Sequence, residues 1–139
     1  FVGLFALKNN LFTMSPLLKN QKGGSTYKNS KIQNQYIKGN VKYSDGTFYE
    51  GDFQVEYNDG IQYPVKHGIG KLIFPDGTKY TGDFKFDFFH GYGFIQYANG
   101  NIYKGGFKDG LYYGYGSLIP SNAEPVTGNW INGTLIKEF

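Results

Sequence analysis

The chain has 139 residues, the length of one ordinary domain, and contains 21 glycines, 13 phenylalanines and 13 tyrosines. It has no cysteine, which excludes disulfide frameworks, thiol catalysis and cysteine-based zinc sites and favours a reducing intracellular compartment. The net charge is +3, and every basic residue is lysine rather than arginine. The lack of arginine argues against bidentate recognition of phosphates or bases.

The N-terminal stretch differs from the rest of the chain. Residues 1–7 are an apolar run, too short for a bilayer span of about 20 residues, and residues 1–40 hold six lysines and no acid. We predict that residues 1–20 form an apolar, basic arm, with a short helical turn opening at Ser15-Pro16. Residues 21–38 are polar and are predicted to be a linker or a degenerate repeat.

Residues 39–133 carry a regular repeat. Gly-x-Gly pairs recur every 23 residues, beginning at Gly68, Gly91 and Gly114. A second motif, Tyr/Val-x-Gly-x-Phe/Trp, keeps the same period and begins at Tyr80, Tyr103 and Val126. A fixed period in this range indicates an array of structural repeats.

Each repeat has the pattern of a β-hairpin. Alternating runs flank the dipeptides Asp45-Gly46, Asp76-Gly77 and Asn99-Gly100, which predict tight type I′ turns and four consecutive hairpins. Residues two apart share a face of a strand, so one face should be lined by rings and glycines and the other should be largely polar. The predicted structural positions are Gly51, Phe53, Gly70, Tyr80, Gly82, Phe84, Gly93, Tyr103, Gly105, Phe107, Gly116, Gly128 and Trp130.

The array is interrupted once. The interval from Phe53 to His67 is fourteen residues, whereas Phe84 to His90 is six. The extra residues alternate around Asn58-Asp59-Gly60, which predicts a hairpin insertion at residues 54–65, with Pro64 at an edge. Residues 134–139 are predicted to be a C-terminal tail.

The motifs of residues 80–107 resemble the MORN repeat (membrane occupation and recognition nexus). The resemblance rests on Tyr80-Thr81-Gly82-Asp83-Phe84, on His90-Gly91-Tyr92-Gly93 and on the Asn99-Gly100 turn, and it extends over about residues 36–133. It implies an all-β, single-layer, elongated antiparallel sheet of about four hairpin repeats. It also implies a non-enzymatic role in scaffolding, self-association or docking, typical of cytoskeletal and ciliary assemblies, especially in protists.

Aromatic residues in the loops are the candidate partner-binding sites. The family's loops before Gly-x-Gly are usually polar, whereas this chain has rings or leucine there, and the insertion adds two tyrosines. The predicted partner-binding residues are Phe86, Phe88, Phe89, Leu111, Tyr112, Tyr57 and Tyr63. The alternative is that these rings pack as ordinary core, in which case replacing Phe88 and Phe89 would disrupt the fold.

No residue pattern indicates catalysis. The sequence has no nucleophile–base pair, and the Gly-x-Gly pairs do not extend to a phosphate-binding G-x-G-x-x-G motif. His67 and His90 occupy equivalent repeat positions without neighbouring metal ligands, so we expect no enzyme activity, no cofactor and no metal.

The predicted function is a structural subunit that docks proteins in an intracellular cytoskeletal, ciliary or membrane-associated assembly. Self-association is possible. The alternative is a peripheral membrane module that uses its basic, apolar N-terminus on anionic lipid. Nucleic-acid binding is not expected, because the array lacks a basic groove that would follow a backbone.

Overall fold

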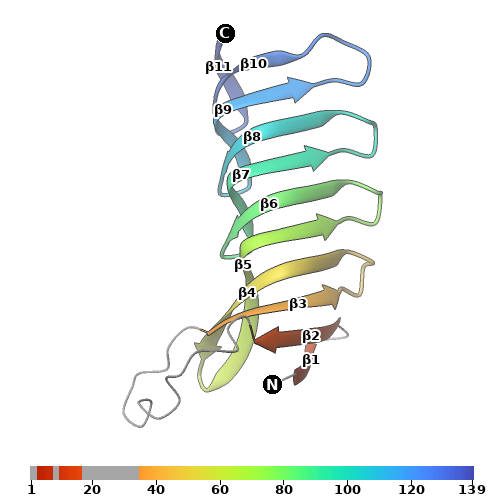
Figure 1. Ribbon diagram of the computed structural model, residues 1–139, viewed down its shortest axis with the longest axis vertical. Coiled ribbons are helices and arrows are strands. Elements are labelled where there is room, and N and C mark those ends of the chain that lie inside the picture. Colours follow the sequence, from red (N-terminus) through yellow and green to blue (C-terminus); the bar gives the residue numbers. More distant parts are fainter. Residues whose placement is uncertain (1–2, 8–9, 17–34) are drawn as a thin grey trace.

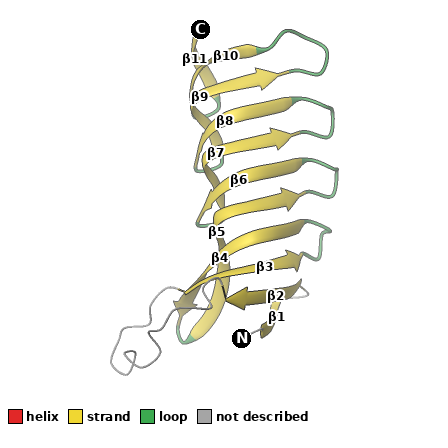
Figure 2. Cartoon of the chain, in the orientation of Figure 1, coloured by secondary structure: helices red, strands yellow, loops and turns green. Residues whose placement is uncertain are grey.

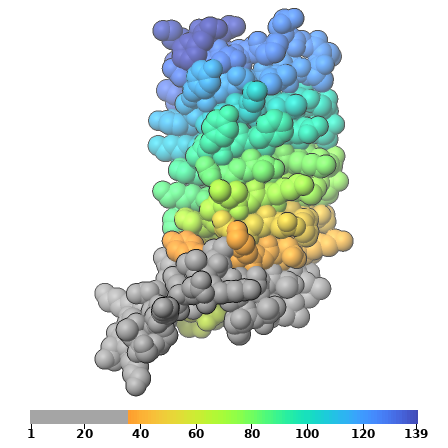
Figure 3. All heavy atoms as spheres, in the orientation of Figure 1, coloured from red at the N-terminus to blue at the C-terminus, as the bar shows by residue number. Residues whose placement is uncertain are grey.

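The computed structural model describes residues 3–7, 10–16 and 35–139. These residues form a single eleven-stranded antiparallel sheet in which the order of the strands follows the sequence (Figure 1). The described residues contain strands and loops but no helix (Figure 2). The strands stack along one long axis, so that the residues from 36 onward follow one another from one end of the body to the other (Figure 3).

The strand boundaries follow the repeat. They are β1 (Gly3–Leu7), β2 (Asn10–Pro16), β3 (Gln35–Lys42), β4 (Phe48–Asn58), β5 (Ile61–Ile73), β6 (Lys79–Lys85), β7 (Phe88–Gln96), β8 (Ile102–Lys108), β9 (Leu111–Ile119), β10 (Val126–Ile131) and β11 (Thr134–Glu138). The predicted all-β, single-layer, elongated sheet is confirmed.

The two ends of the chain differ from the sequence prediction. Ser15 and Pro16 lie in β2, which pairs with β3, rather than in a helical turn, and β1 adds a further strand beside β2. β3 already begins at Gln35, within the predicted linker, while residues 17–34 of that segment lie outside the described residues. The predicted C-terminal tail forms β11, because Asn132-Gly133 makes a tight turn that returns the chain along β10.

The glycines make room for buried tyrosines. Gly82 pairs with Gly93 across β6 and β7, and a Cβ atom on Gly93 would come under 3.0 Å from the ring of Tyr80. The same contact recurs between Gly70 and Tyr49 and between Gly116 and Tyr103. A β-bulge directly after Gly82 then bends β6, and its counterparts bend β4 and β8. The face of the sheet that holds these tyrosines is called the inner face below.

The core of the inner face is a ladder of rings. Phe84 meets Tyr49 edge-on at 5.1 Å and Tyr80 at 5.0 Å, and Phe107 joins Tyr80 and Tyr103 in the same way at 5.3 and 5.1 Å. Edge-to-face pairs at these separations are favourable beyond the burial of their area. Each repeat therefore buries its rings largely against those of its neighbour, as expected for an array whose units do not fold alone.

Hydrogen bonds satisfy the buried hydroxyls of the ladder. The hydroxyl of Tyr80 donates to the carbonyl oxygen of Asp83 at 2.6 Å, and Tyr49 and Tyr103 donate to the corresponding carbonyls. Burial raises the pKa of Tyr103 to about 12 and also raises the pKa of Tyr49 and Tyr80. These phenols are thus neutral donors at ordinary pH.

The predicted type I′ turns are wrong at Asp45-Gly46, Asp76-Gly77 and Asn99-Gly100. At Asp45-Gly46 only the glycine has a positive φ, and the Asp45 carboxylate accepts a hydrogen bond from Thr47 N at 2.8 Å. The reason is loop length, because five residues separate the last paired positions, Lys42 and Phe48. Two-residue turns with both φ values positive lie at the opposite edge, at Asp59-Gly60, Phe86-Asp87, Asp109-Gly110 and Asn132-Gly133.

The insertion extends one hairpin. β4 and β5 stay paired from Gln54 and Val65 out to the turn at Asp59-Gly60. β5 pairs with β6 only from Gly68 onward, so Pro64 lies in the part of β5 that pairs with β4 alone. A proline is tolerated there because one side of the strand has no sheet neighbour in the described structure.

Candidate docking surfaces

The face opposite the ring ladder, called the outer face below, carries exposed apolar side chains. It was predicted to be largely polar, and most of its positions are, but three regularly spaced apolar residues are exposed on it. The middle residues of the Gly-x-Gly pairs, Ile69, Tyr92 and Tyr115, are 63%, 63% and 62% exposed. Alternation explains this, because Gly70, Gly93 and Gly116 must face the inner tyrosines and their neighbours must then face outward.

These three residues, called the outer row below, lie on alternate strands. One strand lies between each of them and the next, and the two inter-strand spacings correspond to about 10 Å along the sheet. Phe94 and Tyr113 add exposed rings beside the row, and the ring of Phe139 stacks on Tyr115 at 5.9 Å. The repeat period itself could have revealed the row, since position x of Gly-x-Gly is apolar in all three copies.

The outer face is also basic. The outward strand positions from β5 to β9 hold the lysines Lys71, Lys79, Lys85, Lys104 and Lys108. Asp83 is the one carboxylate among those positions, and it accepts a hydrogen bond from Tyr92 N at 2.9 Å. Glu50 and Asp52 of β4 border this region, since Glu50 pairs with Lys71 and Asp52 accepts a hydrogen bond from Ile69 N at 3.1 Å, so the basic part of the outer face extends from β5 to β9.

The structure separates the predicted partner-binding residues into two groups. Phe86, Phe88 and Leu111 are about half exposed, at 48%, 54% and 48%, and Tyr63 is also exposed. Phe86, Phe88 and Leu111 lie at or beside the two-residue turns at one edge of the sheet, and Tyr63 lies in the insertion. These are places where accessible side chains are expected.

The other predicted partner-binding residues belong to the packing of the inner face. Phe89 stacks on Tyr80 at 3.8 Å, Tyr112 stacks on Tyr103 at 3.7 Å, and Tyr57 packs against the core. Phe89 and Tyr112 face inward because they pair with the core residues Phe84 and Phe107. Their packing agrees with the alternative that such rings belong to the core, and their role as partner contacts stays a prediction. Replacing Phe89 is expected to disturb the fold.

A hollow of about 520 Å³ opens beside the first ring of this ladder. Its wall includes rings from three elements and one ion pair, namely Tyr43, Phe74, Phe88, Phe89, Lys66 and Asp87. The Lys66 ammonium lies 3.2 Å from the Asp87 carboxylate and 5.2 Å from the centre of the Tyr43 ring. The hollow thus combines flat apolar walls with a charged pair, the usual composition of a small ligand site.

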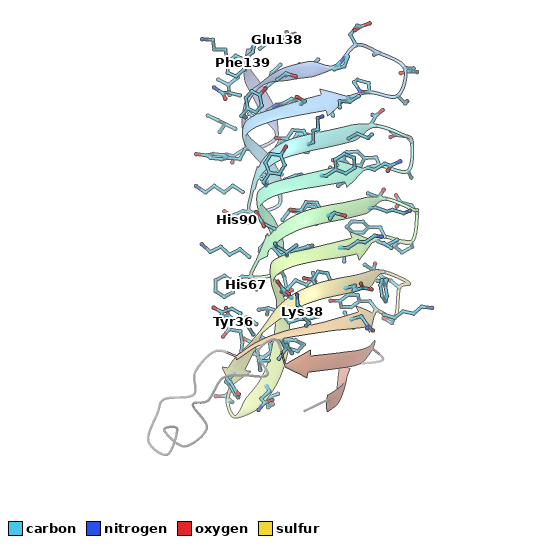
Figure 4. All side chains as sticks on the ribbon, viewed as in Figure 1. Tyr36, Lys38, His67, His90, Glu138 and Phe139 are labelled. Atoms are coloured by element: carbon cyan, nitrogen blue, oxygen red, sulfur yellow. The ribbon has the colours of Figure 1, made fainter. Side chains whose placement is uncertain are left out.

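The two histidines lie one above the other along the turn edge, with Tyr36 below them (Figure 4). His67 Nδ1 accepts a hydrogen bond from Phe86 N at 3.3 Å, and desolvation lowers the pKa of His67. Among the described residues there is no group of three or more His, Asp or Glu side chains that could hold a metal ion. His67 acts here as a packing and turn residue.

Nothing in the described part of the chain is a helix long and apolar enough to cross a membrane.

The hydroxyls of Tyr97 and Tyr112 are joined by a short hydrogen bond. Burial and this hydrogen bond together raise the pKa of Tyr112.

Comparison with protein families agrees with the repeat geometry. The family model described as MORN repeat matches residues 65–79, 80–102 and 103–119. The central match begins at Tyr80 and spans one full period of 23 residues, from one buried tyrosine to the residue before the next. No curated protein matches the chain.

Proposed function

Because this chain is a MORN-repeat protein, with three repeats across residues 65–119, we propose that it is a non-enzymatic structural subunit that docks partner proteins. MORN repeats are commonly protein- or membrane-binding modules. The proposed setting is a larger intracellular assembly of the cytoskeletal, ciliary or membrane-associated kind.

The observation that carries this proposal is the exposure of the outer row. Ile69, Tyr92 and Tyr115 repeat one chemical feature at equal steps on a surface where most neighbours are polar. Exposed apolar groups gathered on one face mark interaction sites, and aromatic residues are enriched in interfaces. A partner that follows the long axis of the sheet meets all three.

Charge defines the partner further. Between β5 and β9 five lysines flank the row against the engaged Asp83, while Glu50 and Asp52 of β4 border only its first member, Ile69, so the docking surface favours an acidic partner. We propose a protein surface in which acidic residues surround apolar ones. Lys71 and Lys104, which face outward beside the row, would supply the complementary charge.

The second candidate is an anionic membrane. Lysines near an anionic surface contribute about 1 kcal/mol each, and tyrosines settle at membrane interfaces. The outer face offers both, whereas the predicted membrane-facing arm is partly used in the sheet as β1 and β2. A protein partner is favoured because a long single-layer sheet bends and twists. The exposed side chains of the outer face then do not lie in one plane, as anchors on a flat bilayer would have to.

The test compares two double variants within the native assembly. Tyr92→Ser with Tyr115→Ser removes the rings, and Thr81→Ala with Gln96→Ala changes exposed polar residues of the same face. We expect the first to leave the assembly and the second to remain, with Trp130 fluorescence and the β-sheet spectrum unchanged in both. Retention of the tyrosine variant at the wild-type level would refute the proposal.

Liposome flotation separates the membrane candidate. The full chain is mixed with phosphatidylcholine vesicles with and without phosphatidylserine. Flotation only with phosphatidylserine, lost in Lys71→Gln with Lys104→Gln, would establish the membrane reading. If the chain does not float with either kind of vesicle, the membrane candidate is rejected and the protein partner is retained for the outer face.

A further inference from the structure

Two successive repeats each depart from the others at one position, and the two exceptional residues touch each other. Lys66 occupies the place that Phe89 and Tyr112 fill in the next repeats, since each pairs with a core ring, Phe53, Phe84 or Phe107. Asp87 occupies the turn position held by Gly110 and Gly133 in the following hairpins. The two exceptional residues form an ion pair at 3.2 Å.

Both departures oppose local preference. Asp87 has a φ of +73°, a backbone region that glycine adopts far more readily. The Lys66 side chain is only 14% exposed although it carries a charge. Residues that break the local rule of an otherwise regular fold are expected at functional sites.

The contacts hold this pair rigidly. Asp87 Oδ1 accepts a hydrogen bond from Lys66 N at 2.7 Å, and Asp87 N donates to the Lys66 carbonyl oxygen at 2.9 Å. The Lys66 ammonium also donates to the Tyr43 hydroxyl at 3.2 Å. An ammonium has three hydrogens, and the contacts with Asp87 and Tyr43 use two of them, so it can donate to one further acceptor.

The hollow forms because Lys66 occupies the position that an aromatic ring, Phe89 or Tyr112, fills in the next two repeats. In the next two repeats Phe89 and Tyr112 cover the buried tyrosine by stacking, whereas the thin side chain of Lys66 leaves about 520 Å³ between the rings of Tyr43, Phe74 and Phe89. This volume is in the range of ligand sites, about 300 to 1,000 Å³.

A later repeat shows which group would fit. Tyr112 fills the equivalent place with a phenol, and its hydroxyl is hydrogen-bonded to Tyr97, the counterpart of Tyr43. A phenol entering the hollow would find flat apolar walls for its ring. Its hydroxyl could accept from Lys66 and donate to the half-exposed Asp87 carboxylate. Because Asp45 also lines the hollow, a neutral group fits better than an anion.

We propose that this hollow is a binding subsite for a tyrosine side chain of a partner protein, which restores the ring missing from the first repeat. The subsite goes beyond the docking role of the outer row, because Lys66 pairs with the core residue Phe53 and so faces the opposite side of the sheet from Tyr92. Variants of the two surfaces can therefore be tested separately.

The experiment uses N-acetyl-tyrosinamide as the probe and N-acetyl-phenylalaninamide as the matched probe without the hydroxyl. Backbone amide signals of the full chain are followed by NMR during titration. We expect the tyrosine probe to shift the amides of Lys66, Asp87 and Gly110, and the phenylalanine probe to bind at least about tenfold more weakly, as expected for the loss of hydrogen bonds to charged groups.

Two variants test the assignment. Lys66→Met keeps the alkyl chain and should reduce binding of the tyrosine probe to the level of the phenylalanine probe. Lys66→Phe combined with Asp87→Gly copies the next repeats, closes the hollow and should abolish binding of both probes while raising the melting temperature. Equal binding of the two probes to the wild-type chain, or no shift at these amides, overturns the proposal irrespective of how the variants fold.

Discussion

At the scale of single residues, the fold depends on glycines that leave space for rings. The ring of Tyr80 lies where a Cβ atom of Gly93 would stand, and the same relation joins Tyr49 with Gly70 and Tyr103 with Gly116. This is a requirement of close approach and not of backbone freedom, since Gly93 does not have a positive φ.

Gly93→Ala is therefore expected to destabilise the protein by about 1–3 kcal/mol, because the added methyl group overpacks a buried ring. The measurement is urea unfolding followed by the fluorescence of the buried Trp130. Gly77→Ala is the control, because a Cβ atom there meets nothing within 4 Å and only its φ of +95° is strained. An equal loss in both variants would contradict the packing explanation.

At the scale of elements, the turn between β6 and β7 is unlike its counterparts. Phe86 has a φ of +47° in the first turn position, where the next hairpins have Asp109 and Asn132. Aspartate and asparagine tolerate this region better than a bulky aromatic residue. Phe86 keeps its place through an edge contact of its ring with His67 at 5.1 Å.

Phe86→Asn is expected to stabilise the protein by up to about 1 kcal/mol, because the backbone strain falls while the half-exposed ring loses little burial. Thermal unfolding followed by circular dichroism measures the change. Asp109→Asn, at the equivalent position with a φ of +51°, is the matched control and should change stability little. A clear loss of stability in Phe86→Asn would show that the contact with His67 outweighs the strain.

At the scale of the whole molecule, the sheet is a one-dimensional array. The same pairing recurs along the sheet. The second glycine of each Gly-x-Gly pair, on β5, β7 and β9, lies opposite the glycine of the following strand, on β6, β8 and β10. Stability should then be a sum over units and their interfaces rather than the property of one closed core.

Deletion of residues 80–102 removes one period and should leave a folded, shorter array, because β5 would meet the Tyr103-x-Gly105 strand as it now meets Tyr80-x-Gly82. We expect a β-sheet spectrum and a reduced dependence of the unfolding free energy on urea, since less surface is exposed on unfolding. Deletion of residues 80–90 is the out-of-phase control and should abolish the cooperative transition. Equal behaviour of the two deletions would refute the array description.

Much of this architecture could be predicted from the sequence. The 23-residue period, the glycines and the alternating rings determined an elongated antiparallel sheet, because each of these features acts between neighbours in the chain or in the adjacent hairpin. Local alternation also placed Tyr80, Phe84, Tyr103 and Phe107 in the core. The interruption before His67 indicated the long hairpin for the same reason.

The tertiary structure alone decided which aromatic residues are free to bind. Phe88 and Phe89 are adjacent in sequence, yet one is exposed and the other stacks on Tyr80, since strand pairing assigns them to different surroundings. The pairing of Lys66 with Asp87 likewise joins two repeats and is invisible to a pattern read one repeat at a time. Composition and period act locally, whereas exposure depends on what the neighbouring strand places opposite each side chain.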